Sequence, residues 1–517
     1  MPVKGIVKKG AYYDSVTLML VARDATKLDG IEDVALMMGT LQNKSILETS
    51  NMLLQEFKDA QDNDLLIAVK GGSEELVEKA LKEIEKLLSK GKSSEESQSD
   101  FVPRSLESAL KVMNDANLVL ISVAGKYAGD EAIKALRNGL HVMIFSDNVP
   151  KEKALLAKQI GYEKGLLVMG PDCGTAIING APLGFSNVVE RGDIGIVSAA
   201  GTGLQEVSSI ISNNGGGISQ AIGTGGIDMK DYYGGLSFLT GLRALIDDPQ
   251  TKVITLISKP PSEIVLKKLK DTLKTTNKPV VGCFLGADES VVKDLGALPA
   301  KTLEEAALLS VSLSKGIPFE SFKKEIDERE ITIKKEAEEL AEKVKQGRKY
   351  FRGLFQGGTL AYETELILTE MLGKIYSNVP LKEEFRLKDS WKSEKHTIVD
   401  LGEDEFTVGR PHPQIDFQLR NKRILEEAKD SEVALIYLDL VIGYGTNMHP
   451  IEDFVPTIEE VTKNGEVIVM VNVTGTDKDP QDKKAIMKAL RDAGAVVYDR
   501  NAYATKVAGN VIKLIGA

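Results

Sequence analysis

Short apolar runs alternate with amphipathic stretches along most of this chain. In the N-terminal part, apolar runs at 5–7, 34–38 and 65–69 predict strands, and helical patterns fill 12–25 and 74–88. A polar, serine-rich stretch at 92–100 then has the composition of a linker or a mobile loop. This part of the sequence therefore predicts a small α/β unit of its own.

From Ser105 onward, apolar runs of strand length alternate with helical patterns. Helices are expected at 130–138, 151–160 and 502–514. The predicted strands are 118–123, 141–145, 166–169, 194–197, 253–257 and 280–283, then 353–355, 397–401, 433–438, 467–471 and 495–498. Such alternation is typical of βαβ units and parallel sheets.

The predicted fold class is therefore α/β, with several Rossmann-like or flavodoxin-like parallel sheets. We expect a small α/β domain at 1–100, parallel-sheet domains at 101–190 and 191–318, a helical connector at 319–349 and a further parallel-sheet domain at 350–517. The connector is rich in Glu, Lys and Ala and has few large apolar residues, which favours a solvent-facing helix.

Composition narrows the classes of function. A chain of 517 residues is too long to fold around a single hydrophobic core. Its 42% hydrophobic and 27% charged residues are typical of an ordinary globular protein. The net charge of -11, without a basic stretch, argues against nucleic-acid binding. No signal peptide or membrane-spanning run is evident, and two cysteines exclude a disulfide scaffold, so we expect a cytoplasmic protein.

Two glycine-rich strand-to-helix turns, far apart in the chain, are the strongest functional features. They lie in Ile194–Glu206 and Phe351–Glu363, and each points backbone N–H groups and the positive end of a helix dipole at one spot. The candidate phosphate- or substrate-binding residues are Ser198, Gly201, Thr202, Gly203, Glu206, Gly357, Gly358 and Thr359. The alternative is a pair of tight turns without a ligand. Glu206 and Glu363 could orient a donor or compensate the helix N-terminus, and for Glu363 we favour the second role.

Other small-residue turns follow predicted strands, where ligands of open parallel sheets bind. Gly225 and Gly226 lie in G-T-G-G, and Asn447 lies in G-Y-G-T-N with His449 two residues beyond. A structural or exposed role for His449 is an equal alternative. Cys173 follows another strand, but no activating partner is visible in the sequence, so we interpret it as a small buried residue.

The loop R-P-H-P at 410–413 carries the most suggestive side chains. Its prolines restrict the backbone around His412, which could act as an acid, a base or a carbonyl polariser. Arg410 offers a planar fork for a carboxylate or phosphate. These two residues are the candidate catalytic pair, and a rigid surface loop is the alternative. His141 and His396 lead into strands and are expected to be structural.

These motifs together resemble the succinyl-CoA synthetase superfamily, and more closely its FdrA branch. G-P-D-C-G at 170–174, G-I-V-S-A-A-G-T-G-L-Q-E at 195–206 and G-T-G-G-I-D at 223–228 are similar to motifs of the synthetase α subunit. G-G-T-L-A-Y-E at 357–363 and V-D-L-G at 399–402 are similar to the C-terminal domain of the β subunit. The FdrA-like pattern is sharpest in D-L-G-E-D-E-F-T-V-G-R-P-H-P. The resemblance implies a CoA-binding-like Rossmann domain at 101–190, fused α-like and β-like flavodoxin domains after it, and no ATP-grasp domain.

The chain departs from the synthetases at two functional positions. The α subunit carries a phosphorylated histidine in G-H-A-G after its K-P-V strand, whereas Lys278-Pro279-Val280 is followed by a segment without histidine. The proline-rich CoA loop is replaced by S-V-A-G-K-Y at 122–127, which puts CoA binding in question. No metal is expected. The expected ligands are small anionic substrates, phosphate or carbamoyl phosphate among them.

The FdrA resemblance implies a carbamoyltransferase subunit acting on oxamate in allantoin degradation, working with partner subunits in an oligomer. In this hypothesis the two helix ends hold phosphate, Arg410 binds the carboxylate, and His412 protonates the leaving nitrogen. One alternative is an acyl-CoA synthetase-like ligase that uses a separate ATP-grasp subunit. The other is a non-catalytic scaffold or ligand sensor.

Overall fold

The computed structural model describes residues 2–11, 13, 15–93, 103, 105–407 and 410–516. The serine-rich linker predicted at 92–100 falls mostly outside the described residues. By their internal contacts the residues form two compact units, one of 1–116 with 403–416 and one of 117–402 with 417–517. Among the described residues, no helix has both the length and the apolar character needed to cross a bilayer.

The first unit is built on an antiparallel sheet in the order β1-β3-β2. Its elements are β1 Val3–Lys8, α1 Ser15–Thr26, β2 Ile31–Met38, α2 Leu41–Thr49, α3 Gln55–Lys58, β3 Leu65–Gly71, α4 Glu74–Ser93, α5 Leu106–Val112 and α15 Asp404–Thr407. Alternate residues of β3 point to opposite faces: Ile67 packs in a core with α1 and α4, and Leu66 packs in another with α2 and α3. Helices α2 and α3 were not predicted.

The second unit begins with a small parallel sheet in the order β4-β5-β6. Its elements are β4 Leu118–Ile121, α6 Gly125–Arg137, β5 His141–Ile144, α7 Lys151–Lys164 and β6 Val168–Met169. Helix α6 begins five residues before the predicted start, because its first residue is Gly125, and glycine is typical of loops and not of helix starts. A fully buried ion pair, Lys158 Nζ to Asp228 at 2.8 Å, ties α7 to the loop after the next sheet's β10.

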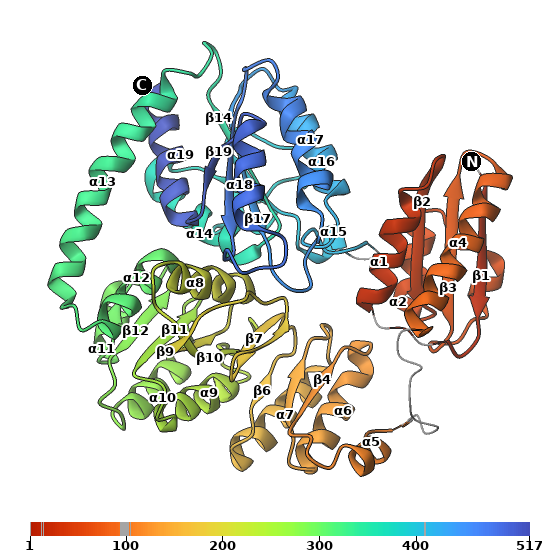
Figure 1. Cartoon of the computed structure of the whole chain (residues 1–517), viewed down its shortest axis with the longest axis horizontal. Helices are drawn as coiled ribbons and strands as arrows, with labels where there is room; N and C mark the ends of the chain where they lie inside the picture. The colour runs from red at the N-terminus through yellow and green to blue at the C-terminus, as the bar shows by residue number, and fades with distance from the viewer. Residues whose placement is uncertain are drawn as a thin grey trace. The chain divides into compact units, whose positions relative to one another are not determined.

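The second sheet of this unit has the order β13-β12-β11-β9-β10-β7-β8. Its elements are β7 Thr175–Ile178, β8 Ala181–Gly184, β9 Arg191–Ser198, α8 Gly201–Asn213, β10 Ile218–Gly223, α9 Leu236–Asp247, β11 Val253–Ser258, α10 Glu263–Leu273, β12 Val280–Phe284, α11 Glu289–Asp294, β13 Leu298–Pro299 and α12 Leu303–Ser314. Helices α8 and α12 cover one face, and α9 and α10 cover the other (Figure 1). The strands β9 to β13 are parallel, whereas the hairpin β7–β8 joins antiparallel.

The hairpin β7–β8 was not predicted. It concerns the boundary that the sequence places between the domains 101–190 and 191–318. Its residues fall in the segment 101–190 but pair with β10 of the following sheet. The four-residue strands are short and carry no clear alternation of apolar and polar residues, so the sequence pattern gave no strand there.

The third sheet is wholly parallel, in the order β15-β16-β14-β17-β18-β19. The remaining elements are α13 Phe319–Ala341, β14 Tyr350–Phe355, α14 Gly358–Leu372, β15 Tyr376–Ser377, the 3-10 helix η1 Glu383–Phe385, β16 Thr397–Asp400, α16 Gln418–Ala428, β17 Val433–Val441, α17 Pro450–Thr462, β18 Ile468–Thr474, α18 Lys483–Asp492, β19 Val496–Tyr498 and α19 Asn501–Gly516. The predicted α/β class with several parallel sheets is confirmed.

The second and third sheets share one hydrophobic core. That core joins Leu204 on α8, Leu303 on α12, Leu360 on α14 and Val507 on α19. The connector α13 buries Ile333 in the same cluster, so it is packed along one face instead of being surrounded by solvent. Because α8 and α14 belong to one core, their N-termini are held at fixed positions relative to each other.

Candidate functional site

The two glycine turns predicted from the sequence meet in space. Helices α8 and α14 start directly after the central strands β9 and β14, and the backbone N–H of Thr359 donates to Thr202 Oγ1 at 3.3 Å. A Cβ atom on Gly357 would lie 3.0 Å from Thr202 Cγ2. The turns therefore touch, and glycine at Gly357 permits that approach.

The first helix N-terminus has no side-chain cap. Ala200 occupies the N-cap position in an extended conformation, and no side chain accepts from the first turn of α8. The hydroxyl of Ser198 is engaged with the backbone of Ala200, accepting from its N–H at 3.0 Å. Gly201 is exposed, so solvent and solutes reach this end of the helix. An uncapped N-terminus with a positive dipole end suits a small anion.

The second helix N-terminus carries its own negative charge. The Asp439 carboxylate accepts from the backbone N–H groups of Gln356 at 2.8 Å and Gly357 at 2.9 Å. The carboxylate of Asp400 also lies close to this helix N-terminus, since a Cβ atom on Gly358 would lie 2.5 Å from Asp400 Oδ2. The two turns are thus electrostatically unlike: the first is open to an anion and the second is compensated by carboxylates.

The sequence analysis did not identify Asp439, although the sequence around it is unusual. It is a single acid in the otherwise apolar and wholly buried strand V-A-L-I-Y-L-D-L-V. Its buried partner is Arg420 on α16, whose Nη1 lies 3.3 Å from Asp439 Oδ1. Burial raises the pKa of Asp439 to about 6, against the opposing effect of Arg420. A lone charge in a buried strand requires a partner, and that requirement could have marked it.

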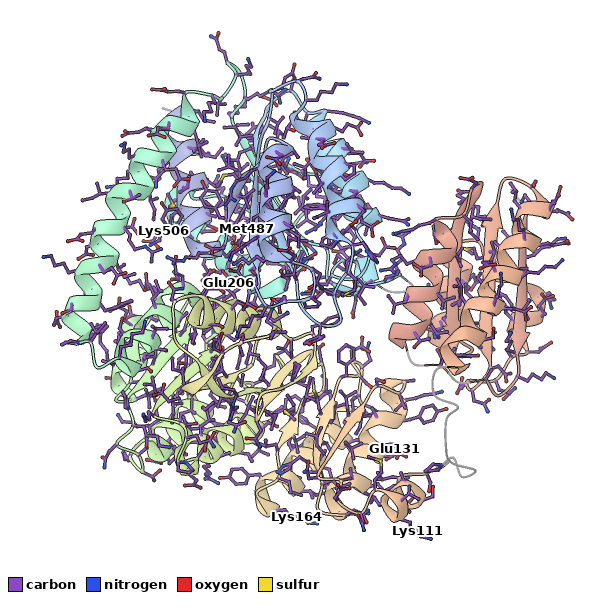
Figure 2. All side chains as sticks on the ribbon, in the orientation of Figure 1. Lys111, Glu131, Lys164, Glu206, Met487 and Lys506 are labelled. Carbon is purple, nitrogen blue, oxygen red and sulfur yellow. The ribbon has the colours of Figure 1, made fainter. Side chains whose placement is uncertain are left out.

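Glu206 and Glu363 occupy matching places on the two helices and share a contact with Asn501. The backbone N–H of Asn501 donates to Glu206 Oε1 at 2.8 Å, and Asn501 Nδ2 donates to Glu363 Oε2 at 2.8 Å. Glu206 also bonds the Thr474 hydroxyl, and Glu363 accepts from the Leu303 N–H at 2.7 Å. Figure 2 places Glu206 on the side of its domain that faces the third sheet. Both glutamates therefore connect the domain of the second sheet to the domain of the third sheet.

Burial raises the pKa of Glu206 to about 7 and that of Glu363 to about 8. Near neutral pH both groups thus hold a proton for much of the time. Neither side chain is exposed, so neither is available to a ligand without movement of the helices. These carboxyls position the helices that carry the turns.

A Glu206→Gln variant tests this protonation. The folded state holds a proton that the unfolded chain releases above about pH 4.5, so the wild-type free energy of unfolding falls as pH rises towards about 7. Glutamine cannot release a proton, so the free energy of unfolding of the variant should not fall in this way. Measured by denaturant titration, the stability of the variant relative to wild type should rise by roughly 1–3 kcal/mol between pH 5 and pH 8. The control is Glu190→Gln, an exposed residue paired with Lys478. Equal slopes for Glu206→Gln and wild type would show that Glu206 is ionised in the fold.

The remaining predicted turns have structural partners. Gly225 adopts a φ of +80°, and a Cβ atom there would lie 2.2 Å from the Pro171 carbonyl oxygen. Asn447 donates to Asp453 at 3.0 Å and accepts from the His449 N–H at 2.7 Å, and these contacts hold the loop before α17 in place. His449 is exposed, as is part of the loop around it. Gly226 lies against the backbone of Ala199, close to the first turn.

Arg410 and His412 lie in a different compact unit from the glycine turns. They belong to the unit of 1–116 with 403–416, whereas both turns belong to the other unit. His412 is half-buried, and its Nδ1 accepts from the Gln414 N–H at 3.2 Å. Burial lowers the pKa of His412 to about 4, so the ring is neutral at pH 7. A neutral imidazole is a weak proton donor, which does not favour the predicted role as an acid.

The remaining buried or half-buried histidines and cysteines have structural roles. Nδ1 of His141 accepts from the Leu167 N–H at 2.8 Å, and Nδ1 of His396 accepts from the Phe351 N–H at 3.2 Å. Burial raises the pKa of Cys173 to about 12, which leaves an unreactive thiol at neutral pH. Cys283 is also buried, with its pKa raised for the same reason.

Comparison with known proteins gives matches in both units. Residues 1–103 match the family described as AllF, heavy metal-associated domain, and residues 354–511 match the family described as CoA-ligase. The uncharacterized protein YahF of Escherichia coli K12 is 43% identical over 502 residues, which cover 96% of each chain. The mitochondrial succinate–CoA ligase [ADP-forming] subunit alpha-2 of Trichomonas vaginalis is 30% identical over 35% of this chain and 60% of its own length. The dinucleotide-forming acetyl-coenzyme A synthetase 1 of Ca. Korarchaeum cryptofilum superposes with a TM-score of 0.32 at 13% identity, over 77% of this chain and 82% of its own.

These matches overturn the expected enzyme class. The sequence resemblance was taken to imply a carbamoyltransferase acting on oxamate, but the matched family is CoA-ligase and the partial relatives are succinate–CoA ligase subunits. The carbamoyltransferase prediction is therefore wrong, and with it the roles given to Arg410 and His412 in carbamoyl transfer lose their basis. What the comparisons support is a CoA-ligase-like, succinyl-CoA synthetase α-like domain within the chain.

The N-terminal match raises the question of a metal. Most heavy-metal sites use thiolate or imidazole ligands, with thioether as a further soft ligand. Residues 1–103 contain neither cysteine nor histidine, and among the described residues no three His, Cys, Asp or Glu side chains gather in a metal-binding arrangement. The loop after β1 is instead held by a carboxylate, since Asp64 accepts from the Gly10 N–H at 2.8 Å. The donor set does not fit a heavy metal held by thiolate or imidazole groups.

Proposed function

Because this chain belongs to the FdrA-like family of the succinyl-CoA synthetase superfamily, we propose that it is the acyl-transfer component of a CoA ligase. In this proposal, a separate ATP-grasp protein supplies the nucleotide chemistry. The observation that carries the proposal is the contact between the N-termini of α8 and α14 at Thr202 and Thr359. The uncapped turn of α8 would hold a phosphate or acyl phosphate, and Thr202 would line it.

Residues at the start of α6, beside the first parallel sheet, fit the binding of CoA. Helix α6 starts at the carboxyl end of β4 without a side-chain cap, and both Lys126 and Tyr127 at its start are exposed. A cation and a helix N-terminus suit phosphates, and an exposed aromatic ring suits a purine. Gly125 allows this turn to approach Asp147, because a Cβ atom there would lie 2.1 Å from the Asp147 carbonyl oxygen. CoA would supply the thiol that accepts the acyl group.

One observation favours a second candidate, a ligand-binding scaffold without turnover. The segment that follows Lys278-Pro279-Val280 runs through β12 and α11 and carries no histidine, so the phosphohistidine step of the synthetases has no counterpart at that place. A chain that lost this residue could retain ligand binding alone. It could also pass an acyl phosphate directly between subunits, which is the form of ligase that we propose.

The test is acyl-CoA formation from ATP, CoA and short carboxylic acids. The purified chain, a candidate ATP-grasp protein and their mixture are assayed side by side for acyl-CoA and for ADP with phosphate. We expect product only in the mixture, because the nucleotide and the acyl site reside on different chains. Saturable binding of phosphate without product in any combination would favour the scaffold, and the ligase proposal would fail.

A further inference from the structure

Arg420 is a fully buried arginine that uses only part of its hydrogen-bonding capacity. Its Nη1 donates to the backbone oxygen of Asp439 and lies 3.3 Å from Asp439 Oδ1. Its Nε and Nη2 have no hydrogen-bond partner. A buried donor without a partner is energetically costly, more so when the group is charged, so this arrangement calls for a partner.

The surroundings keep the side chain charged and shielded. The rings of Phe417 and Phe454 have their centroids 5.1 Å and 4.5 Å from Arg420 Cζ. Burial lowers the pKa of Arg420 to about 10, which still leaves a cation at pH 7. The aromatic faces stabilise that cation but offer no hydrogen-bond acceptor in its plane.

The two unused donors form one edge of the guanidinium. In arginine, Nε–H and Nη2–H point in the same direction and are spaced like the two oxygens of a carboxylate or phosphate. The opposite side is already occupied by Asp439, whose carboxylate accepts from the N–H groups of Gln356 and Gly357. Asp439 therefore links the guanidinium of Arg420 to the glycine turn that opens α14.

An unused acceptor lies on the next residue of α16. Asn421 donates through Nδ2 to the Asp453 carbonyl oxygen at 2.7 Å, while its buried Oδ1 has no partner. Arg420 and Asn421 thus both contact the start of α17, one at Phe454 and the other at Asp453. Only the donors of Arg420 suit an anion, because the Asn421 oxygen is itself an acceptor and needs a donor such as a hydroxyl group.

We propose that the Nε–Nη2 edge of Arg420 binds the carboxylate of a small organic acid. This deepens the proposed ligase function, and rests on it, by giving the acid substrate a recognition residue. Inorganic phosphate has the same oxyanion chemistry, and the experiment separates the two. Because Arg420 is enclosed, the ligand must be small and enter by local opening around α16 and α17.

Calorimetric titration of the full chain, without partner or nucleotide, tests the proposal. Acetate, succinate and phosphate are compared at constant ionic strength against chloride. Arg420→Lys keeps the charge but loses the two-donor edge, and it should weaken carboxylate binding at least tenfold. The matched control is Arg423→Lys on the same helix, because Arg423 is equally buried but all its nitrogens are engaged, with Glu427, Ser390 and Ser393. It should leave binding unchanged.

Three outcomes overturn the proposal. These are no saturable carboxylate binding by the wild type, equal losses in the two variants, or saturable binding of phosphate alone. In the first case the edge holds only water. Saturable carboxylate binding that depends on Arg420, but without acyl-CoA formation in the mixed assay, would keep the site and reject the ligase function.

Arginine-selective nuclear magnetic resonance of the wild type covers the case in which Arg420→Lys does not fold. The Nε–H signal of Arg420 is recognised by its proximity to the rings of Phe417 and Phe454. It should shift saturably during the succinate titration, because a new acceptor is placed on that hydrogen. A signal that stays in place through saturation would overturn the proposal.

Discussion

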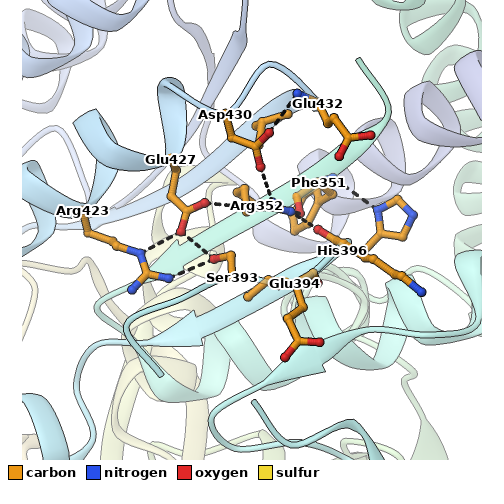
Figure 3. A network of polar contacts seen from close by, with 12 residues as sticks. Phe351, Arg352, Ser393, Glu394, His396, Arg423, Glu427, Asp430 and Glu432 are labelled. Carbon is orange, nitrogen blue, oxygen red and sulfur yellow. Dashed lines mark hydrogen bonds and ion pairs between the residues drawn. The ribbon is translucent and has the colours of Figure 1, made fainter. Parts of the chain in front are cut away.

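Replacing Glu427 by glutamine is expected to lower the free energy of unfolding by about 3–5 kcal/mol, because it leaves two buried cations without their shared carboxylate. Glu427 Oε2 accepts from Arg352 Nε at 2.7 Å, and its Oε1 accepts from Arg423 Nε at 2.7 Å (Figure 3). The same guanidinium of Arg352 reaches Asp430 at 3.0 Å and the Lys395 carbonyl. This network ties α16 to β14 and to the segment before β16.

Denaturant unfolding checks this expectation, with Glu432→Gln as the matched control. Glu432 pairs with Lys349 at 2.6 Å, but both side chains are half exposed. Loss of an exposed pair should change stability by less than about 1 kcal/mol. If the two variants are destabilised equally, the buried network contributes no more than a surface ion pair does.

Replacing Ala200 by aspartate is expected to raise stability and abolish anion binding at the first turn. Ala200 is the uncapped N-cap residue of α8, so an aspartate there can accept from the N–H groups of Thr202 or Gly203. A new cap contributes about 0.5–2 kcal/mol to stability. The same carboxylate occupies the donors that would face a phosphate and repels it, and loss of such donors costs roughly 100-fold or more in turnover.

Ala200→Asn separates the charge from the cap. Asparagine caps about as well as aspartate but brings no negative charge. We expect phosphate affinity to fall less in Ala200→Asn than in Ala200→Asp, with similar melting temperatures for both. Stabilised variants that bind phosphate and form acyl-CoA like the wild type would show that the first turn is a structural turn without a ligand.

The sequence pattern was sufficient for most of the parallel architecture. Strands such as β11 and β17 are predominantly apolar, since helices bury both of their faces, and such runs are visible without a structure. Patterns were least informative where elements are short. The strands β7 and β8 and the helix α3 have four residues each, and α2 has nine. Elements this short give a weak periodic signal, so they depend on the sheet and core that they join.

Function was harder to obtain from residues alone. The two glycine turns were visible as motifs, but the chemistry assigned to R-P-H-P followed from a family association and was wrong in its enzyme class. Arg420 gave no motif at all, because one arginine in the helix sequence Q-L-R-N-K-R looks like any other. Its importance comes from Asp439, 19 residues away, and from two phenylalanines.

By itself, the sequence determined the α/β class, the order of most strands and helices, and the two turns that open α8 and α14, since these depend on local period and on glycine. Only the tertiary structure decided that the turns touch, that the first is uncapped and the second compensated by Asp439, and that Arg410 and His412 belong to another unit. These features depend on which distant residues share a buried space. Burial sets both the cost of an unpaired charge and the pKa of a carboxyl, and no local pattern records it.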